Sequence, residues 1–346
     1  MEEKDSIHKG FKIFIIVITI IALIYINRDN LLGFLQGSKS DLSLIESIED
    51  DYDYRFFNGE IIKYNDEGIA HLEDSHQVVL QKDFGFHEPV INFDNQYIYY
   101  ADGQTGHVYI LDNKLETISQ FNLDMNIFNI EETGKYIMVH SKEDVETLYL
   151  IDNEGSIIYK NSPDGNILNY DIGNNTYGFV TLSIDGEIKS TLHLYDFQGQ
   201  LDQTMDFEDE VIFKMDYIDD NILLLTDKNL YMMDRQILWS NEYSLIKNIL
   251  IEDERIFLLY SNTLETLDLS GNILETLEVE ENYDMIKGME DGLILYGERD
   301  ILIIKDEEIY RLTIDEDIES LSGHGNYLIV NSESSSNIYE LETNEE

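Results

Sequence analysis

The chain has 346 residues, enough for one large domain or two of ordinary size, and 43% of them are hydrophobic, so it can bury a large core. Cysteine is absent, which excludes disulfides, a thiolate nucleophile and cysteine-ligated zinc. The net charge of −49 argues against binding to nucleic-acid phosphates or anionic lipid, and would attract cations or basic partners.

Residues 11–28 are predicted to be a transmembrane anchor that follows a cytoplasmic tail at 1–10. The run 13–26 contains no charged residue, and its flanks can extend it toward the roughly 20 residues that cross a bilayer. A cleaved signal peptide is the alternative, but no small-residue cleavage pattern follows the run. Three lysines precede it, against Arg28 and Lys39 behind it, which predicts a cytoplasmic N-terminus and an extracytoplasmic remainder.

Residues 29–54 are predicted to be a polar linker, with a short helical turn near Leu42–Ile48. The acidic run from Glu49 to Asp53 lacks the alternating oxygen ligands and the glycine of a calcium loop. We therefore interpret it as part of the solvated linker.

A repeated phrase occupies the rest of the chain, 55–346. In the copy "LYLIDNEGSIIYK" at 148–160, two apolar runs flank an Asp-Asn-Glu-Gly turn, which predicts a hairpin of two strands. The copies recur with a period of about 38 residues. Their turn acids are Asp74, Asp112, Asp152, Asp196, Asp234, Asp268, Asp306 and Glu342.

A second series of apolar segments runs in phase with the first, and a further short strand usually precedes each of its members. The segments begin at Ile61, Tyr97, Tyr136, Tyr177, Ile222, Ile256, Leu293 and Tyr327. Four short strands per period are typical of a β-propeller blade, whose apolar faces are covered by stacking on its neighbours. The sequence thus predicts an all-β fold, a propeller of eight four-stranded blades. Arg55–Phe57 would complete the last sheet, and seven blades result if the terminal units merge.

The sequence names no catalytic, cofactor-binding or metal-binding residue. Aspartates at repeated turns accept hydrogen bonds from their own backbone, so we interpret them as structural. The histidines are His8, His71, His76, His87, His107, His140, His193 and His324, and none has a zinc-ligand spacing. Whether they meet at the propeller axis stays open.

The "L-x-D-x-x-G" corners after an N-terminal anchor resemble the quinoprotein-like propeller superfamily. More closely, the chain is similar to an uncharacterised family of single-pass membrane proteins from Firmicutes. In quinoprotein repeats a tryptophan commonly follows the corner and docks blade on blade. Only Trp239 matches that position here, with Tyr159 and Tyr310 nearby in their copies. The resemblance implies a propeller, and its superfamily includes scaffolds such as the propeller lipoprotein of outer-membrane protein assembly.

Two functions follow from this reading. The first is a non-enzymatic, membrane-tethered scaffold at the cell envelope, without a cofactor, whose propeller face holds a protein or a cell-wall component. The second is an extracytoplasmic enzyme, either a quinone-type dehydrogenase or a lyase or hydrolase, with several histidine, arginine and aspartate residues meeting near the axis. The copy that departs most from the phrase, Asp234–Trp239, is the first place to look for a specialised role.

Overall fold

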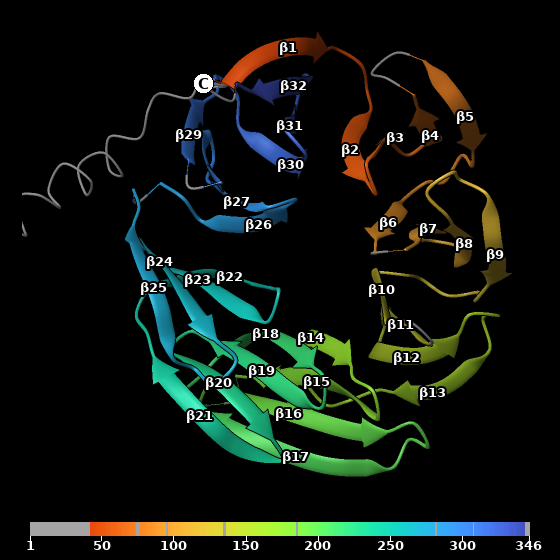
Figure 1. Ribbon diagram of the computed structural model, residues 1–346. Helices are drawn as coiled ribbons and strands as arrows, with labels where there is room; N and C mark the ends of the chain where they lie inside the picture. Colours follow the sequence, from red (N-terminus) through yellow and green to blue (C-terminus); the bar gives the residue numbers. More distant parts are fainter. Residues whose placement is uncertain are drawn as a thin grey trace, which may run out of the picture.

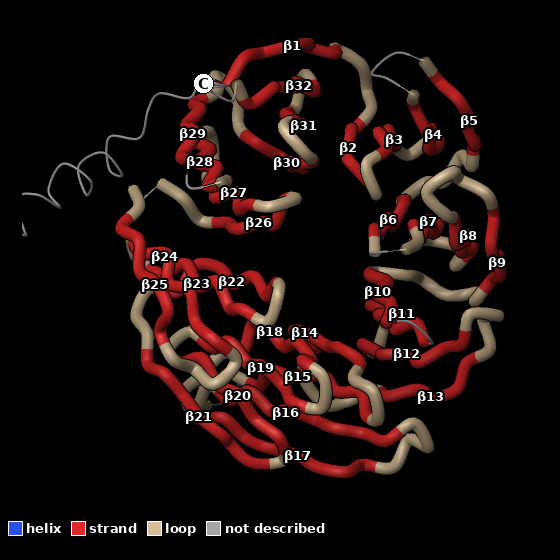
Figure 2. The backbone as a smooth tube through the Cα atoms, in the orientation of Figure 1, coloured by secondary structure: helices blue, strands red, loops and turns tan. Residues whose placement is uncertain are grey.

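The computed structural model describes residues 42–342 apart from 74–76, 95, 134–135, 185, 281 and 307. These residues form eight four-stranded antiparallel sheets, arranged as the blades of a ring (Figure 1). The predicted all-β propeller and its eight blades are confirmed. Strands joined by loops make up the described chain in Figure 2.

The strands are named from the ring axis outward. The inner strands are β2 (Asp53–Phe57), β6 (Pro89–Phe93), β10 (Asn129–Thr133), β14 (Asn166–Ile172), β18 (Ile212–Ile218), β22 (Ile246–Glu252), β26 (Met285–Met289) and β30 (Ile318–His324). The second strands are β3 (Glu60–Tyr64), β7 (Ile98–Asp102), β11 (Tyr136–Lys142), β15 (Thr176–Ser183), β19 (Asn221–Thr226), β23 (Arg255–Tyr260), β27 (Gly292–Tyr296) and β31 (Tyr327–Ser332).

The outer half of each blade contains the corner hairpin. The third strands are β4 (Gly68–Leu72), β8 (His107–Leu111), β12 (Glu146–Asp152), β16 (Lys189–Asp196), β20 (Asn229–Asp234), β24 (Thr263–Asp268), β28 (Asp300–Lys305) and β32 (Ser336–Leu341). The outer strands are β5 (Val78–Asp83), β9 (Thr117–Asn122), β13 (Ile157–Asn161), β17 (Leu201–Glu208), β21 (Gln236–Glu242), β25 (Ile273–Glu278), β29 (Glu308–Thr313) and β1 (Leu42–Ile48). The blades are numbered 1 to 8 from β2–β5 to β30–β32 with β1.

The first strand of the chain closes the ring. β1 pairs with β32, from Leu42 opposite Leu341 to Ile48 opposite Ser336, and is the outer strand of blade 8. The helical turn predicted at Leu42–Ile48 is therefore wrong, and the blade strands begin inside the predicted linker. The closing role predicted for Arg55–Phe57 is also wrong, because these residues belong to β2, the inner strand of blade 1.

The hydrophobic core is divided among the boundaries between blades. Between blades 7 and 8, for example, Ile294 and Ile301 of one blade pack with Leu328 and Val330 of the next, all at 0% exposure. Middle strands such as β4 and β7 are buried at every position, because each of their faces meets another blade. Within residues 42–342, the described chain contains no helix of the length and hydropathy needed to cross a membrane. The predicted anchor at 11–28 lies outside the described residues.

Candidate functional site: the blade boundaries and the channel

The corner aspartates hold turns. The Oδ1 atom of Asp152 accepts hydrogen bonds from the backbone N–H groups of Glu154 at 3.0 Å and Ser156 at 2.8 Å. Gly155 completes this turn with a φ of +84°, a conformation that costs a glycine little. The same pair of bonds forms at the corners of Asp112, Asp196 and Asp268. Their structural interpretation is confirmed.

The remaining corners depart from this pattern. At Asp234 and Asp306 the turn is shorter, and positive φ angles fall on Arg235 at 47° and on Asp306 at 51°. Within the described residues, neither aspartate carboxylate makes a hydrogen bond. Asp74, His76 and the C-terminal residues 343–346 lie outside the described residues.

Aromatic side chains dock adjacent blades at three boundaries. The indole Nε1 of Trp239 in blade 5 donates to the backbone oxygen of Leu269 in blade 6 at 3.0 Å, and a Cβ on Gly271 would lie 2.8 Å from the indole. Tyr159 covers Gly199 between blades 3 and 4 in the same way. Trp239 therefore docks blade on blade, as the family resemblance implies.

Phe121 performs the same docking between blades 2 and 3, where its ring lies against Gly155. The sequence analysis missed this residue because Phe121 follows its corner by two positions more than Tyr159 does. Ser119 occupies the corresponding corner position and donates to the backbone oxygen of Asn153 at 2.8 Å.

Two other boundaries lack a docking aromatic and are hollow. Between blades 4 and 5, Gln203 takes the position and donates to the backbone oxygen of Arg235 at 2.7 Å, beside a polar cavity of about 360 Å³. Between blades 6 and 7, Glu275 takes the position, beside a cavity of about 420 Å³. The local sequence thus decides which boundaries are closed.

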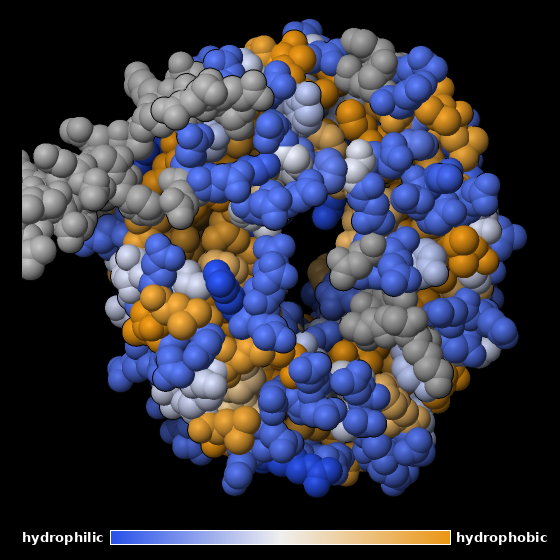
Figure 3. All heavy atoms as spheres, viewed as in Figure 1, coloured by the Kyte–Doolittle hydropathy of each residue, from blue (hydrophilic) through white to orange (hydrophobic). Residues whose placement is uncertain are grey.

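The channel of the ring has opposite charges on opposite sides. The residue paired with the second position of each predicted second-strand segment forms a ring at one level. In blades 1 and 7 this residue is Arg55 and Lys287, and in blades 4 and 5 it is Asp171 and Asp216. Figure 3 shows hydrophilic residues around the open centre of the propeller.

Burial shifts the pKa of several channel groups. It raises the pKa of Glu131 to about 7 and of Asp171 to about 6, and the charge of Asp216 raises both further. On the opposite side, burial and the nearby charge of Arg55 lower the pKa of Lys287 to about 8. The channel therefore contains ionisable groups that titrate near neutral pH.

Most of these channel charges also hold blades together. The Oδ2 atom of Asp171 accepts from the backbone N–H of Tyr217 in blade 5 at 2.6 Å. Lys287 Nζ donates to the backbone oxygen of Leu321 in blade 8 at 2.9 Å. Such bonds to a neighbouring backbone explain the buried charges structurally, since each connects two inner strands.

The histidines do not converge on the channel. His71 and His140 each contact a glutamate of their own blade, at 3.0 and 3.1 Å. His193 pairs with Thr181 at 3.0 Å in blade 4. In the part of the chain that the structure describes, no group of three histidine or acidic side chains could hold a metal ion.

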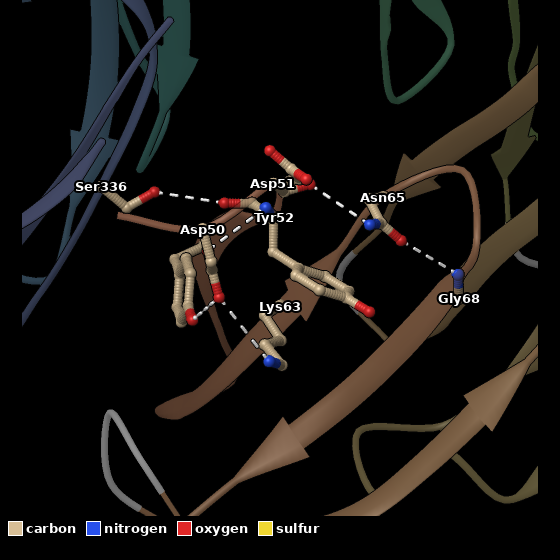
Figure 4. Close-up of polar contacts among 8 residues, drawn as sticks. Asp50, Asp51, Tyr52, Lys63, Asn65, Gly68 and Ser336 are labelled. Carbon is tan, nitrogen blue, oxygen red and sulfur yellow. Dashed lines mark hydrogen bonds and ion pairs between the residues drawn. The ribbon is translucent and has the colours of Figure 1, made fainter. Parts of the chain in front are cut away.

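The seam where the ring closes is an acidic loop that the sequence analysis assigned to a solvated linker. Asp50 Oδ2 accepts from the hydroxyl of Tyr54 at 2.9 Å and lies 3.8 Å from Lys63 Nζ (Figure 4). Ser336 of blade 8 donates to the backbone oxygen of Tyr52 at 3.3 Å. Asp50 therefore fixes the connection between the last and first blades.

The outer rim exposes aliphatic side chains at a recurring position just after the corner. They are more than one third exposed, and Figure 3 shows hydrophobic patches at the outer edge over β5, β9 and β25. The residues are Leu44, Ile45, Val78, Val79, Leu80, Ile118, Ile157, Leu201, Ile237, Leu238, Ile273 and Leu274. The outer strands also pair on one side only, so their other backbone edge is open.

Comparison with known proteins supports the fold. The sequence profile of a family of unknown function (DUF5711) matches residues 38–339. No curated protein matches the chain significantly. Among solved structures, the chain is similar to BamB from Moraxella catarrhalis, with a TM-score of 0.58 and 12% identity over 86% of this chain and 99% of BamB.

Two further structures show the same architecture. The computationally designed Ika8 protein gives a TM-score of 0.53 and 11% identity, over 81% of this chain and 98% of Ika8. The WD40 domain of Pan2 from Neurospora crassa gives a TM-score of 0.50 and 10% identity, over 74% of this chain and 90% of the domain. At these identities the likeness extends to the fold alone.

Proposed function

We propose that this chain, which belongs to the DUF5711 family of unknown function, is a non-enzymatic binding or scaffold propeller. Residues 11–28 tether it to the cell membrane with the N-terminus in the cytoplasm, and the propeller holds an envelope protein or cell-wall component outside. The acidic composition and the likeness to BamB are compatible with this role.

The observation that carries the proposal is the apolar rim. Exposed aliphatic residues on a protein of net charge −49 contribute nothing to solubility, and contiguous apolar surface marks sites of interaction. The open backbone edges beside them can hydrogen-bond an extended segment of a partner, while the aliphatic side chains give it apolar contacts. Protein binding along the rim follows from both features.

Site-specific photocrosslinking in the native membrane tests this proposal. We expect a benzophenone amino acid at Ile237, on the rim, to give a discrete adduct that a second change, Leu238→Glu, removes. Ile184, which is 70% exposed in the β15–β16 connection, is the matched control and should give none. Equal labelling from both sites, or no adduct from Ile237, would contradict binding at the rim.

The topology has its own test. Protease added to intact cells after wall removal should digest the propeller and leave the cytoplasmic tail. A protected propeller would refute the outward orientation, and a mature chain that begins after residue 28 would refute the tether.

An extracytoplasmic enzyme is the second candidate, and the channel acids favour it. Glu131 and Asp171 have pKa values raised toward neutrality, as general acids and bases often do. Purified protein would be incubated with pyrroloquinoline quinone and calcium and then examined for a bound chromophore and dehydrogenase turnover. Turnover that Glu131→Gln abolishes would support the enzyme and contradict the scaffold.

A further inference from the structure

The boundary between blades 6 and 7 lacks the aromatic residue that closes its neighbour. Trp239 pairs with Met232, two residues before the corner Asp234, and its ring reaches into blade 6. Glu275 has the same register, because it pairs with Thr266, two residues before Asp268. Glu275 makes no hydrogen bond or ion pair with the described part of the chain. An aromatic position has therefore been replaced by an exposed carboxylate.

The vacated position leaves an apolar groove. Its walls include Phe257 and Leu277 of blade 6 and Ile304 of blade 7, all of them half-buried. The volume of about 420 Å³ lies within the roughly 300–1,000 Å³ of small-ligand pockets and accommodates one aromatic side chain. Figure 3 shows hydrophobic atoms recessed between these two blades.

The polar residues around the groove are mostly acidic. Besides Glu275, the carboxylates that line it are Glu252, Asp253, Asp291 and Asp306. Of the two cations, Lys305 is 9% exposed and donates to the backbone oxygen of Gly325 at 2.6 Å. Arg255 alone presents an exposed positive charge. The surroundings favour a cationic ligand.

We propose that this groove receives the aromatic side chain of a partner protein, presented on an extended segment with basic residues on both sides. The inference rests on the proposed binding function and names the chemistry of one partner contact. The partner's ring would lie where Trp239, Tyr159 and Phe121 lie at the closed boundaries, and its basic neighbours would face the five carboxylates.

A labelled peptide tests the proposal on the full-length protein in detergent. The probe is acetyl-Lys-Lys-(5-fluorotryptophan)-Lys-Lys-amide, observed by ¹⁹F NMR. We expect a saturable resonance shift that the unlabelled Trp peptide reverses. Competition of equal strength by the Lys-Lys-Ala-Lys-Lys peptide would reduce the effect to charge alone, and equal competition by Glu-Glu-Trp-Glu-Glu would remove the need for basic flanks. Either result overturns the proposal.

Two variants locate the site. Glu275→Trp fills the groove from the chain itself and should weaken peptide binding at least tenfold. Glu278→Trp makes the same substitution on the opposite face of β25 and should leave the affinity unchanged. Arg255→Glu, which removes the exposed cation, should tighten binding several-fold. Unchanged binding by Glu275→Trp, with native circular dichroism, would refute the location.

The outcome separates this inference from the proposed function. If the peptide does not bind while the rim crosslink from Ile237 persists, the groove proposal fails and the scaffold remains. If both fail, the binding function itself is refuted.

Discussion

Asn331 and Tyr54 lie 277 positions apart in the chain and exchange two hydrogen bonds across the seam between blades 8 and 1. The amide of Asn331 donates to the backbone oxygen of Tyr54 at 2.9 Å and accepts from its N–H at 3.1 Å. Ser320 and Ser336 satisfy the remaining polar capacity of the buried side chain. The carboxamide thus acts like an extra stretch of backbone between two inner strands.

Replacing Asn331 by alanine should destabilise the whole propeller. Both backbone groups of Tyr54 would lose buried partners, at a cost of about 2–4 kcal/mol in the free energy of unfolding. Urea denaturation measures this loss. Asn337→Ala removes a single 3.2 Å bond to Ser335 and is the matched control. A loss for Asn331→Ala no larger than the control's would show that the seam contributes little.

Trp239 should report on one boundary of the ring. Trp239→Phe keeps a ring over Gly271 but loses the bond to Leu269, for about 1 kcal/mol, whereas Trp239→Ala leaves a cavity and costs about 3–5 kcal/mol. Because the chain has one tryptophan, its fluorescence follows this boundary during denaturation. Equal stability of the two variants would mean that the indole does not pack as described.

The stability of the protein should depend on pH through Glu131. Burial raises its pKa from 4.5 to about 7, so between these values the folded chain binds more protons and loses stability as the pH rises. Glu131→Gln should therefore be more stable than the unmodified chain at pH 8, by about 1–3 kcal/mol, and equal to it at pH 4. Thermal unfolding at both values tests this. A similar gain from the exposed Glu187→Gln would point to net charge instead.

The corner aspartates should separate into two groups. Asp152→Ala removes the acceptor of two backbone N–H groups and should cost about 1 kcal/mol. Asp234→Ala, at a corner where the carboxylate makes no described hydrogen bond, should cost almost nothing. Thermal melting compares them directly. Equal losses would give Asp234 a role that its contacts do not show.

The sequence predicts the parts of the fold that repeat. Alternation around the phrase at 148–160 is enough to locate hairpins, and the period is enough to stack them as blades. β1 escapes this reasoning because Leu42–Ile48 matches no repeat, and only its pairing with β32 makes it a strand. The channel escapes for a related reason. Glu131, Asp171 and Asp216 come from three blades, and no local spacing reveals that a ring brings them together.

The pairing of β1 with β32 also has a consequence for synthesis. Leu42 leaves the ribosome long before its partner Leu341 has been translated. At about 5–20 residues per second, the wait is roughly 15–60 s, during which blade 8 cannot form. The earlier blades can assemble in sequence from local hairpins, but the ring stays open until the final strands arrive. Release of the completed chain, rather than any single blade, therefore sets when the protein becomes resistant to proteolysis.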